Sequence, residues 1–126
     1  MDKLKFRREI YKRIPKSFNT KGIYTISINN YIVYVGESVN VADRVLQHSW
    51  QVLTATPKDG KYWHLRRARD KGYKITISLA EDCRNCSEAE RMQKEIEWIK
   101  FFNPPLNVMY TKGSGMHLQE FYENVV

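Results

Sequence analysis

The first apolar residues of the chain recur at helical spacing among charged ones. This spacing predicts a short amphipathic helix over residues 3–13, and Pro15 is expected to end it because proline has no backbone N–H to donate. The side chains expected on one side of this helix are Leu4, Phe6, Ile10 and Ile14. Residues 1–21 hold eight Lys and Arg against two acidic residues, and we interpret them as a basic N-terminal helical arm.

Two stretches rich in β-branched and aromatic residues follow, at 22–28 (GIYTISI) and 31–36 (YIVYVG). Such residues favour strands because their side chains pack well on a pleated surface. Asn29-Asn30 lies between the two stretches and is typical of a turn. The pattern therefore predicts a β-hairpin.

Beyond the hairpin the pattern predicts two helices, a strand and a longer helix. The expected ranges are helices at 39–53 and 61–71, a strand at 73–80 and a helix from 88 to about 102. Ser87 with Glu90 forms a capping box at the start of the last helix, and Asn103-Pro104-Pro105 ends it. The order α-ββ-α-α-β-α predicts a mixed α/β (α+β) fold, with a small three-stranded antiparallel sheet flanked by helices.

The chain has 126 residues and a net charge of +7, and the charge is unevenly distributed. Residues 58–74 carry seven Lys and Arg against two acids, whereas residues 79–97 carry six acids against three bases. Two basic stretches with interleaved aromatic residues favour a polyanionic ligand, because neutralising phosphates releases counterions. No apolar run approaches the roughly 18 residues of a membrane span, and no signal-peptide pattern is present. We therefore expect a cytoplasmic protein with no membrane partner.

Cys83 and Cys86 form the only CxxC pair of the chain. A zinc site would need two further ligands at suitable spacing, and the three histidines offer none. We expect two reduced thiols, with a CxxC metal or redox protein as the weakest alternative.

Gly22-Ile23-Tyr24 and, on the predicted partner strand, Tyr34-Val35-Gly36 resemble the signature of the GIY-YIG nucleases. Arg44 follows Gly36 by eight residues, and His48 follows one helical turn later. Glu95 and Asn107, in the run from Glu95 to Asn107 (EIEWIKFFNPPLN), resemble the matching helix of phage homing nucleases and of the bacterial excision-repair incision subunit. The resemblance spans residues 22–108, and we assign 22–110 to a nuclease domain and 111–126 to a C-terminal tail packed on it.

The resemblance implies a metal-dependent DNA endonuclease that leaves 5′-phosphate and 3′-hydroxyl ends. It implies Mg²⁺ as the cofactor, with Mn²⁺ as a substitute, and Glu95 as its only protein ligand. Tyr24 would act as general base with Tyr34 assisting, although direct attack by the tyrosine stays an alternative. The implied catalytic residues are Tyr24, Tyr34, Arg44, His48, Glu95 and Asn107.

Elementary geometry supports part of this set. Arg44 and His48 stand at i and i+4, so both reach one phosphate from the same helix face, and a guanidinium suits that contact. In the last helix, Glu95 borders the expected buried stripe, whereas Glu97 faces water. That stripe consists of Ala89, Met92, Ile96, Ile99 and Phe102.

The hairpin register decides whether the two tyrosines share a face. A two-residue turn without a bulge would pair Tyr24 with Val35 and place Tyr34 on the opposite face. A three-residue loop over residues 28–30 would pair Tyr24 with Tyr34 directly. We therefore predict an odd-numbered loop or a β-bulge.

The remaining basic residues are expected to contact the DNA backbone. Those named for this role are Lys61, His64, Arg66, Arg67 and Arg69 in the basic helix, and Lys12 and Arg13 in the arm. A merely solvated face is the alternative for the basic helix. At the level of the whole chain, the alternative is a non-catalytic nucleic-acid-binding module on a nuclease-like fold. A homodimer also stays open, because one site cuts one strand at a time.

Overall fold

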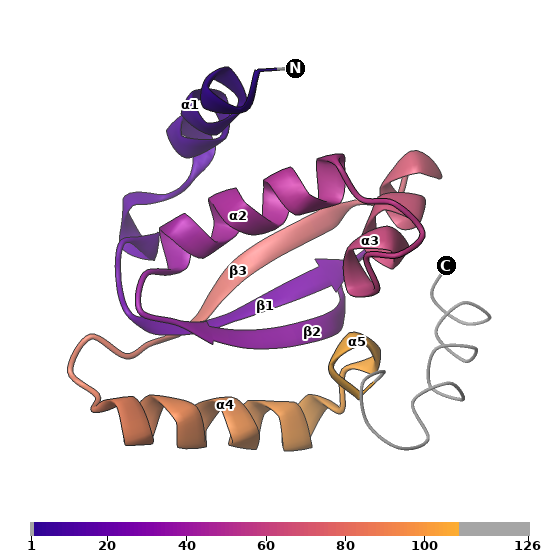
Figure 1. Cartoon of the computed structure of the whole chain (residues 1–126). Coiled ribbons are helices and arrows are strands. Elements are labelled where there is room, and N and C mark those ends of the chain that lie inside the picture. Colours follow the sequence, from indigo (N-terminus) through magenta and orange to yellow (C-terminus); the bar gives the residue numbers. More distant parts are fainter. Residues whose placement is uncertain (1, 109–126) are drawn as a thin grey trace.

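In the computed structural model, which describes residues 2–108, a three-stranded antiparallel sheet is covered by helices on both faces (Figure 1). The strand order is β2-β1-β3, so β1 is central and β2 is an edge strand. The elements are α1 (Lys3–Arg13), η1 (Lys16–Phe18), β1 (Gly22–Ile28), β2 (Tyr31–Ser38), α2 (Val41–Leu53), α3 (Lys61–Asp70), β3 (Ile75–Asp82), α4 (Glu88–Phe102) and α5 (Pro105–Val108). The predicted fold class is confirmed.

Local sequence explains where several helices begin and end. The side chain of Asn40 accepts a hydrogen bond from the backbone N–H of Asp43 and so caps α2. Ser87 and Glu90 form the predicted capping box of α4, and Asn103, in the left-handed conformation, ends that helix. The four-residue helix α5 was not predicted, because the two prolines before it indicated only a helix stop.

Successive side chains of β1 point to opposite faces of the sheet. Tyr24, Ile26 and Ile28 are buried in the larger core, where they pack with residues of α2 and α3 such as Val45 and Leu65. Figure 1 shows α2 and α3 on one side of the sheet and α4 on the other. The second core, against α4, is smaller and contains Ile23, Val35 and Cys83, with Trp98 and Ile99 packed on it.

Of the stripe expected to bury α4, only Ile99 packs on the core, and the prediction is wrong for the other four residues. Met92 and Ile96 are 49% and 44% exposed, and Ala89 and Phe102 are exposed as well. The helix instead packs through Arg91, which is only 5% exposed, and through Trp98, whose indole N–H donates to the Glu81 carboxylate at 3.0 Å. Polar partners on the strands satisfy these side chains, so the packing face is not the most apolar one.

The N-terminal helix α1 packs against α2. The rings of Phe6 and Trp50 meet edge to face, with centroids 5.4 Å apart. Ile10 and Ile14 are partly buried as expected, whereas Leu4 is 57% exposed. The C-terminal tail predicted at 111–126 lies outside the described residues. Within residues 2–108, none of the helices has the length and apolar character needed to span a membrane.

Candidate active site

Tyr24 and Gly36 are direct partners across the β1–β2 pair. Tyr24 is only 1% exposed, and its ring lies against the backbone of Gly36. A Cβ atom on Gly36 would stand 2.4 Å from both Cζ and the hydroxyl oxygen of Tyr24. The glycine therefore leaves the space through which the Tyr24 hydroxyl reaches across the edge strand.

The hairpin register brings the two tyrosines together by a route that was only partly predicted. Asn29-Asn30 forms a two-residue turn with positive φ at both positions, so the three-residue loop is wrong. The alternative prediction, a bulge, is confirmed: the register shifts next to Ile26, which then pairs with Tyr34, while Tyr24 pairs with Gly36. Tyr24 and Tyr34 thus share a face as diagonal neighbours rather than direct partners, with ring centroids 6.3 Å apart.

His48 lies buried on α2 between two tyrosines. Its Nε2 is 2.6 Å from the Tyr24 hydroxyl, and its Nδ1 is 2.7 Å from the hydroxyl of Tyr62 on α3. Burial, with Lys61 and Arg44 nearby, lowers the pKa of His48 to about 3. The imidazole is therefore neutral at neutral pH, so it donates to one phenol and accepts from the other. Tyr62 was not predicted, because nothing in the sequence links a position 14 residues away to His48.

Two cationic side chains lie beside this aromatic group. Lys61 Nζ is 4.2 Å from the Tyr34 ring centroid and 5.1 Å from that of Tyr62. Burial and the charge of Arg44 lower the pKa of Lys61, which places both cations in one neighbourhood. Clustered cations repel each other unless an anion lies between them, so this arrangement favours a bound phosphate.

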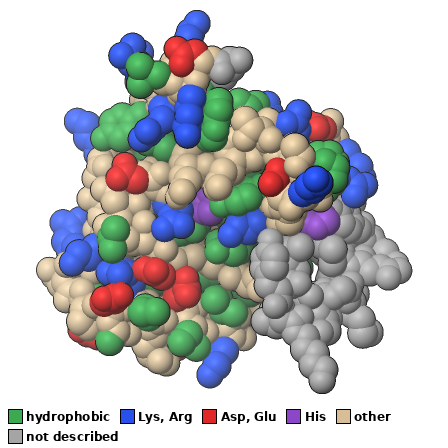
Figure 2. Space-filling model, in the orientation of Figure 1, with side chains coloured by type: hydrophobic (Ala, Val, Ile, Leu, Met, Phe, Trp, Pro, Cys, Tyr) green, Lys and Arg blue, Asp and Glu red, His purple; other side chains and the backbone are tan. Residues whose placement is uncertain are grey.

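Glu95 reaches the same end of β2 from the other face of the sheet. Burial and the neighbouring carboxylate of Glu37 raise the pKa of Glu95, and the backbone N–H of Glu37 partly offsets this by hydrogen bonding. Glu37 itself pairs with Arg91 at 2.6 Å. In the described part of the chain no ion pair involves Glu95. Figure 2 shows acidic side chains gathered between the sheet edge and α4, with Lys and Arg side chains above them.

Asn107 does not contact either tyrosine through a hydrogen bond. Its Oδ1 accepts from the backbone N–H of Val35 at 2.7 Å, and its Nδ2 donates to the Val35 carbonyl at 2.8 Å. The amide thus pairs with the open edge of β2, between Tyr34 and Gly36. Asn107 positions the strand that carries the site, and α5 holds it there through buried Leu106.

The basic residues of α3 have different environments. The guanidinium of Arg66 donates to the Leu53 carbonyl and pairs with Asp70 at 3.6 Å, so it joins α3 to the end of α2. His64 is half-buried, and burial followed by the charge of Arg67 lowers its pKa. Arg67 and Arg69 are exposed. Of the predicted set on this helix, only Lys61 joins the tyrosine and histidine group.

The predicted contact of Lys12 and Arg13 with DNA stays a prediction, and other residues of α1 lie beside Arg44. Lys12 and Arg13 belong to the last turn of α1. The residues of α1 that line a groove together with Arg44 are Lys3 and Arg7, in its first two turns. The helical period explains the difference, because positions 3 and 7 share a face that positions 12 and 13 do not continue.

Cys83 and Cys86 are free thiols, and burial raises the pKa of Cys83 to about 11. Cys83 therefore remains a thiol at neutral pH, which is unfavourable for redox exchange. Within residues 2–108 no three His, Cys, Asp or Glu side chains are grouped so as to hold a metal ion.

Comparison with known proteins identifies relatives, although no protein-family model matches the chain. Endonuclease II of Enterobacteria phage T4 is 28% identical over 110 residues, which cover 79% of each chain. UvrABC system protein C of Corynebacterium aurimucosum is 29% identical over 102 residues, which cover 79% of this chain. The match spans only 13% of that relative's length.

The predicted resemblance of the chain to the GIY-YIG nucleases is confirmed. Among solved structures, the GIY-YIG N-terminal endonuclease domain of UvrC from Thermotoga maritima, in a point mutant bound to the catalytic divalent cation, is 18% identical, with a TM-score of 0.49. That alignment covers 82% of this chain and 96% of the other.

The residues around Glu95 fit a hard divalent cation better than a soft one. Among residues 2–108, Glu95 is a half-buried carboxylate that forms no ion pair, and a second carboxylate, Glu37, is already paired with Arg91. A cation that keeps most of its water ligands, such as Mg²⁺, needs only one or two protein carboxylates. A bound cation would also relieve the repulsion between Glu95 and Glu37.

The buried state of His48 predicts how the stability of the domain depends on pH. The unfolded chain, with a pKa near 6.5, takes up a proton as the pH falls, whereas the folded chain does so only near 3. Stability is therefore lost between pH 6.5 and 3, by about 2 kcal/mol between pH 6.5 and 5 at roughly 1.4 kcal/mol per unit. Urea denaturation at both pH values should show this excess loss for the wild type relative to His48→Gln. Parallel losses in the two proteins would contradict a neutral buried imidazole.

Proposed function

We propose that the chain is a divalent-metal-dependent endonuclease that hydrolyses DNA phosphodiester bonds with a GIY-YIG site. The observation that carries the proposal is the contact between Tyr24 and His48 at 2.6 Å, flanked by Arg44 and Lys61. Neither residue type is unusual alone, but a neutral buried histidine that binds a phenol beside two cations is suited to proton transfer next to a phosphate. Endonuclease II, a relative by sequence, is named for this activity.

Glu95 would hold the cation, Mg²⁺ or Mn²⁺ in its place. When bound, the cation supplies positive charge to the phosphoryl oxygens and lowers the pKa of coordinated water. Arg44 and Lys61 stabilise the charge that develops on the phosphate, from the α2 and α3 side of the site. The substrate phosphate would thus lie between the cation on one side and these two side chains on the other.

The proton of the attacking water is proposed to leave through Tyr24. Burial and Tyr34 raise the pKa of Tyr24 above its ordinary value, so a free tyrosinate does not accumulate at neutral pH. Tyr24 instead accepts the proton of the water as it gives its own to His48 Nε2, so that no separate charge forms on the phenol. The entering phosphodiester anion raises the low pKa of His48 and so makes the imidazole a better acceptor.

Tyr62 is proposed as a positioning residue for this transfer. If Nε2 of His48 accepts from Tyr24, then Nδ1 carries the hydrogen and donates to the Tyr62 oxygen at 2.7 Å. This contact fixes both the tautomer and the ring orientation of His48. Asn107 acts in the same indirect way, by holding the strand that carries Tyr34.

The second candidate is a nucleic-acid-binding module without catalysis. The positive charge and the cations beside Tyr34 would serve that function as well. It leaves unexplained why the half-buried carboxylate of Glu95 is held against Glu37 with no ion pair to any residue of 2–108, since such a group costs stability. A double-strand break would require two such sites or two successive cuts by one site, and we extend the proposal to a homodimer on duplex targets.

Nicking of supercoiled plasmid DNA tests the proposal. The wild type with Mg²⁺ or Mn²⁺ is expected to nick the plasmid, and EDTA should stop the reaction. Arg44→Ala should slow nicking by about a hundredfold to a thousandfold, the usual cost of one transition-state donor. Arg8→Ala, an exposed arginine of α1, is the charge-matched control and should cut at the wild-type rate. DNA binding without nicking, on plasmid and branched DNA with either metal, would instead favour the binding module.

A further inference from the structure

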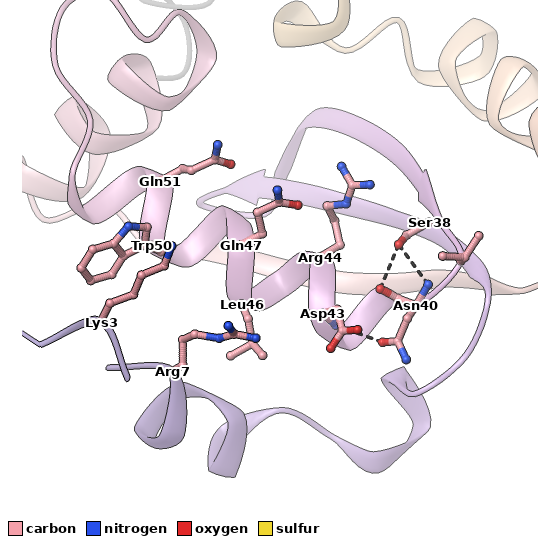
Figure 3. A pocket seen from close by; sticks show the side chains of 11 residues that line it. Lys3, Arg7, Ser38, Asn40, Asp43, Arg44, Leu46, Gln47, Trp50 and Gln51 are labelled. Atoms are coloured by element: carbon pink, nitrogen blue, oxygen red, sulfur yellow. Dashed lines mark hydrogen bonds between the residues drawn. The ribbon is translucent and has the colours of Figure 1, made fainter. Parts of the chain in front are cut away.

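A groove of about 510 Å³ is lined by residues of α1 and α2, and Arg44 is one of them (Figure 3). Arg44 belongs to both the groove and the site, because it lines the groove and also acts electrostatically on Tyr24 and His48. The groove therefore continues the site in one direction, toward the N-terminal arm. The proposed catalytic roles leave the rest of its lining unexplained.

The charged side chains that line the groove are mostly cationic. They are Lys3 and Arg7 from α1 and Arg44 from α2, against one acid, Asp43. In the described part of the chain no ion pair involves any of the three cations, whereas Lys3 Nζ lies 5.6 Å from the Trp50 ring centroid. A concave surface with excess positive charge concentrates an anionic ligand.

The lining along α2 repeats at helical spacing. Figure 3 shows Arg44, Gln47 and Gln51 leaving the same side of the helix on successive turns. From the first to the last of them the helix rises about 10 Å, at 1.5 Å per residue. A nucleic-acid strand carries one phosphate per roughly 3.4 Å of axis, so this row spans about three phosphates. The guanidinium and the two amides of this row each carry N–H groups that can donate to phosphate oxygens.

The position of α1 is set by packing that does not depend on a ligand. Phe6 meets Trp50 edge to face, and Lys3 lies over the same indole ring. The side chains of Lys3 and Arg7 stand one helical turn apart, on the face toward α2. The groove is therefore formed before a substrate binds, which lowers the entropic cost of binding.

We propose that the groove binds the backbone phosphates of the DNA strand next to the scissile phosphate, with Lys3 and Arg7 as its main contacts. The proposal rests on the proposed function for the nature of the substrate, but not on cleavage itself. It makes the arm a part of the substrate-binding surface through its first two turns. The contacts are to phosphate and not to bases, so they add affinity and alignment without reading sequence.

A matched pair of variants on the same helix tests the proposal. Lys3→Ala/Arg7→Ala removes two charges from the groove, and Lys5→Ala/Arg8→Ala removes two exposed charges of α1 that do not line it. Binding of a fluorescent DNA duplex in EDTA, followed by anisotropy, should weaken at least about tenfold for the first pair and threefold or less for the second. For the first pair, the slope of log K against log salt concentration should become shallower by about two, because two phosphate contacts are lost.

A change on α2 checks the same groove without altering α1. Gln47→Glu introduces a negative charge into the lining and should weaken DNA binding about as much as the loss of Lys3 and Arg7. Gln93→Glu, at an exposed position of α4, is its control. Circular dichroism should show wild-type helicity for all four variants. If one variant of a pair has lost helicity, the other groove variant and its own control decide the test.

The position of the contact is tested with neutral phosphates. Methylphosphonate groups, placed one at a time on either side of the mapped cleavage position, should weaken wild-type binding on one side within about three phosphates. The same groups should cause no further loss in Lys3→Ala/Arg7→Ala, because coupled changes are not additive.

If the two α1 variants weaken DNA binding equally, the proposed groove site is wrong, and only the net charge of the helix contributes to binding. Because binding is measured in EDTA, selective weakening without any nicking would support the groove and contradict the nuclease. Plasmid nicking by the wild type, together with equal weakening of DNA binding by the two α1 variants, would support the nuclease and contradict the groove.

Discussion

Glu95→Gln is expected to reduce metal-dependent DNA cleavage by about a thousandfold or more, while the domain folds at least as stably as the wild type. The carboxylate is the one group in our proposal that holds the cation, and a cation supplies several kcal/mol of transition-state stabilisation. Glutamine keeps the size of the side chain but loses the charge. The effect should therefore fall on catalysis and not on the shape of the site.

The stability part of this prediction follows from the pKa of Glu95. Burial and Glu37 raise it, so the folded state disfavours the ionised form and the charge lowers stability at neutral pH. Removing the charge should leave the melting temperature unchanged or higher. A residue that weakens the fold and is needed for cleavage has the behaviour expected of a functional group.

Glu97→Gln is the matched control, because Glu97 is an exposed carboxylate two residues further along α4. It should leave nicking and melting unchanged. Plasmid nicking with Mg²⁺, thermal melting and DNA binding in EDTA are the three measurements. Wild-type cleavage by Glu95→Gln would remove Glu95 from the site, and equal losses for both variants would point to a general charge effect.

Gly36→Ala is expected to lower cleavage by about a hundredfold or more and to destabilise the domain by about 1–3 kcal/mol. The added Cβ would stand 2.4 Å from Cζ and the hydroxyl oxygen of Tyr24, closer than any real contact of this kind. Either the tyrosine or strand β2 must move. Both changes would separate the Tyr24 hydroxyl from His48 Nε2, which lies within hydrogen-bond distance of it at 2.6 Å.

A double-mutant cycle with Tyr24→Leu separates this clash from a general effect on the strand. Leucine lacks the atoms that meet the added methyl group, so Gly36→Ala should cost little further stability in the Tyr24→Leu background. Tyr31→Thr, at a half-exposed position of β2, is a control for changes elsewhere in the strand. Urea denaturation measures the stability and plasmid nicking the activity. Additive destabilisation in the cycle would contradict the direct contact between position 36 and the phenol ring.

The hairpin shows how far local sequence reaches in this fold. Two asparagines between strand-forming stretches predicted the turn, and both adopt the positive φ that a two-residue turn needs. The need for Tyr24 and Tyr34 to share a face predicted the bulge. Its place next to Ile26 and the pairing of Tyr24 with Gly36 depend on how both strands fill the core under α2, which local propensity does not encode.

Helix α4 shows where periodicity fails. Its ends were predicted from Ser87, Glu90 and Asn103, because capping is a local interaction. Its packing face was not, because Arg91 and Trp98 find polar partners on Glu37 and Glu81 that lie more than fifteen residues away in the chain. Glu95 still lies at the inner edge of the helix, but beside Arg91 and not beside the expected apolar stripe.

The sequence by itself determined the longer helices and the strands, since these follow from short spacings and from residue chemistry, and its resemblance to the GIY-YIG nucleases supplied the candidate catalytic residues. Only the tertiary structure decided that Tyr62 binds His48, that Asn107 holds the edge of β2, and that Lys3 and Arg7 share a groove with Arg44. Each of these contacts joins residues from separate elements. Their distances depend on how helices pack across a sheet, and no periodicity within one element records that packing.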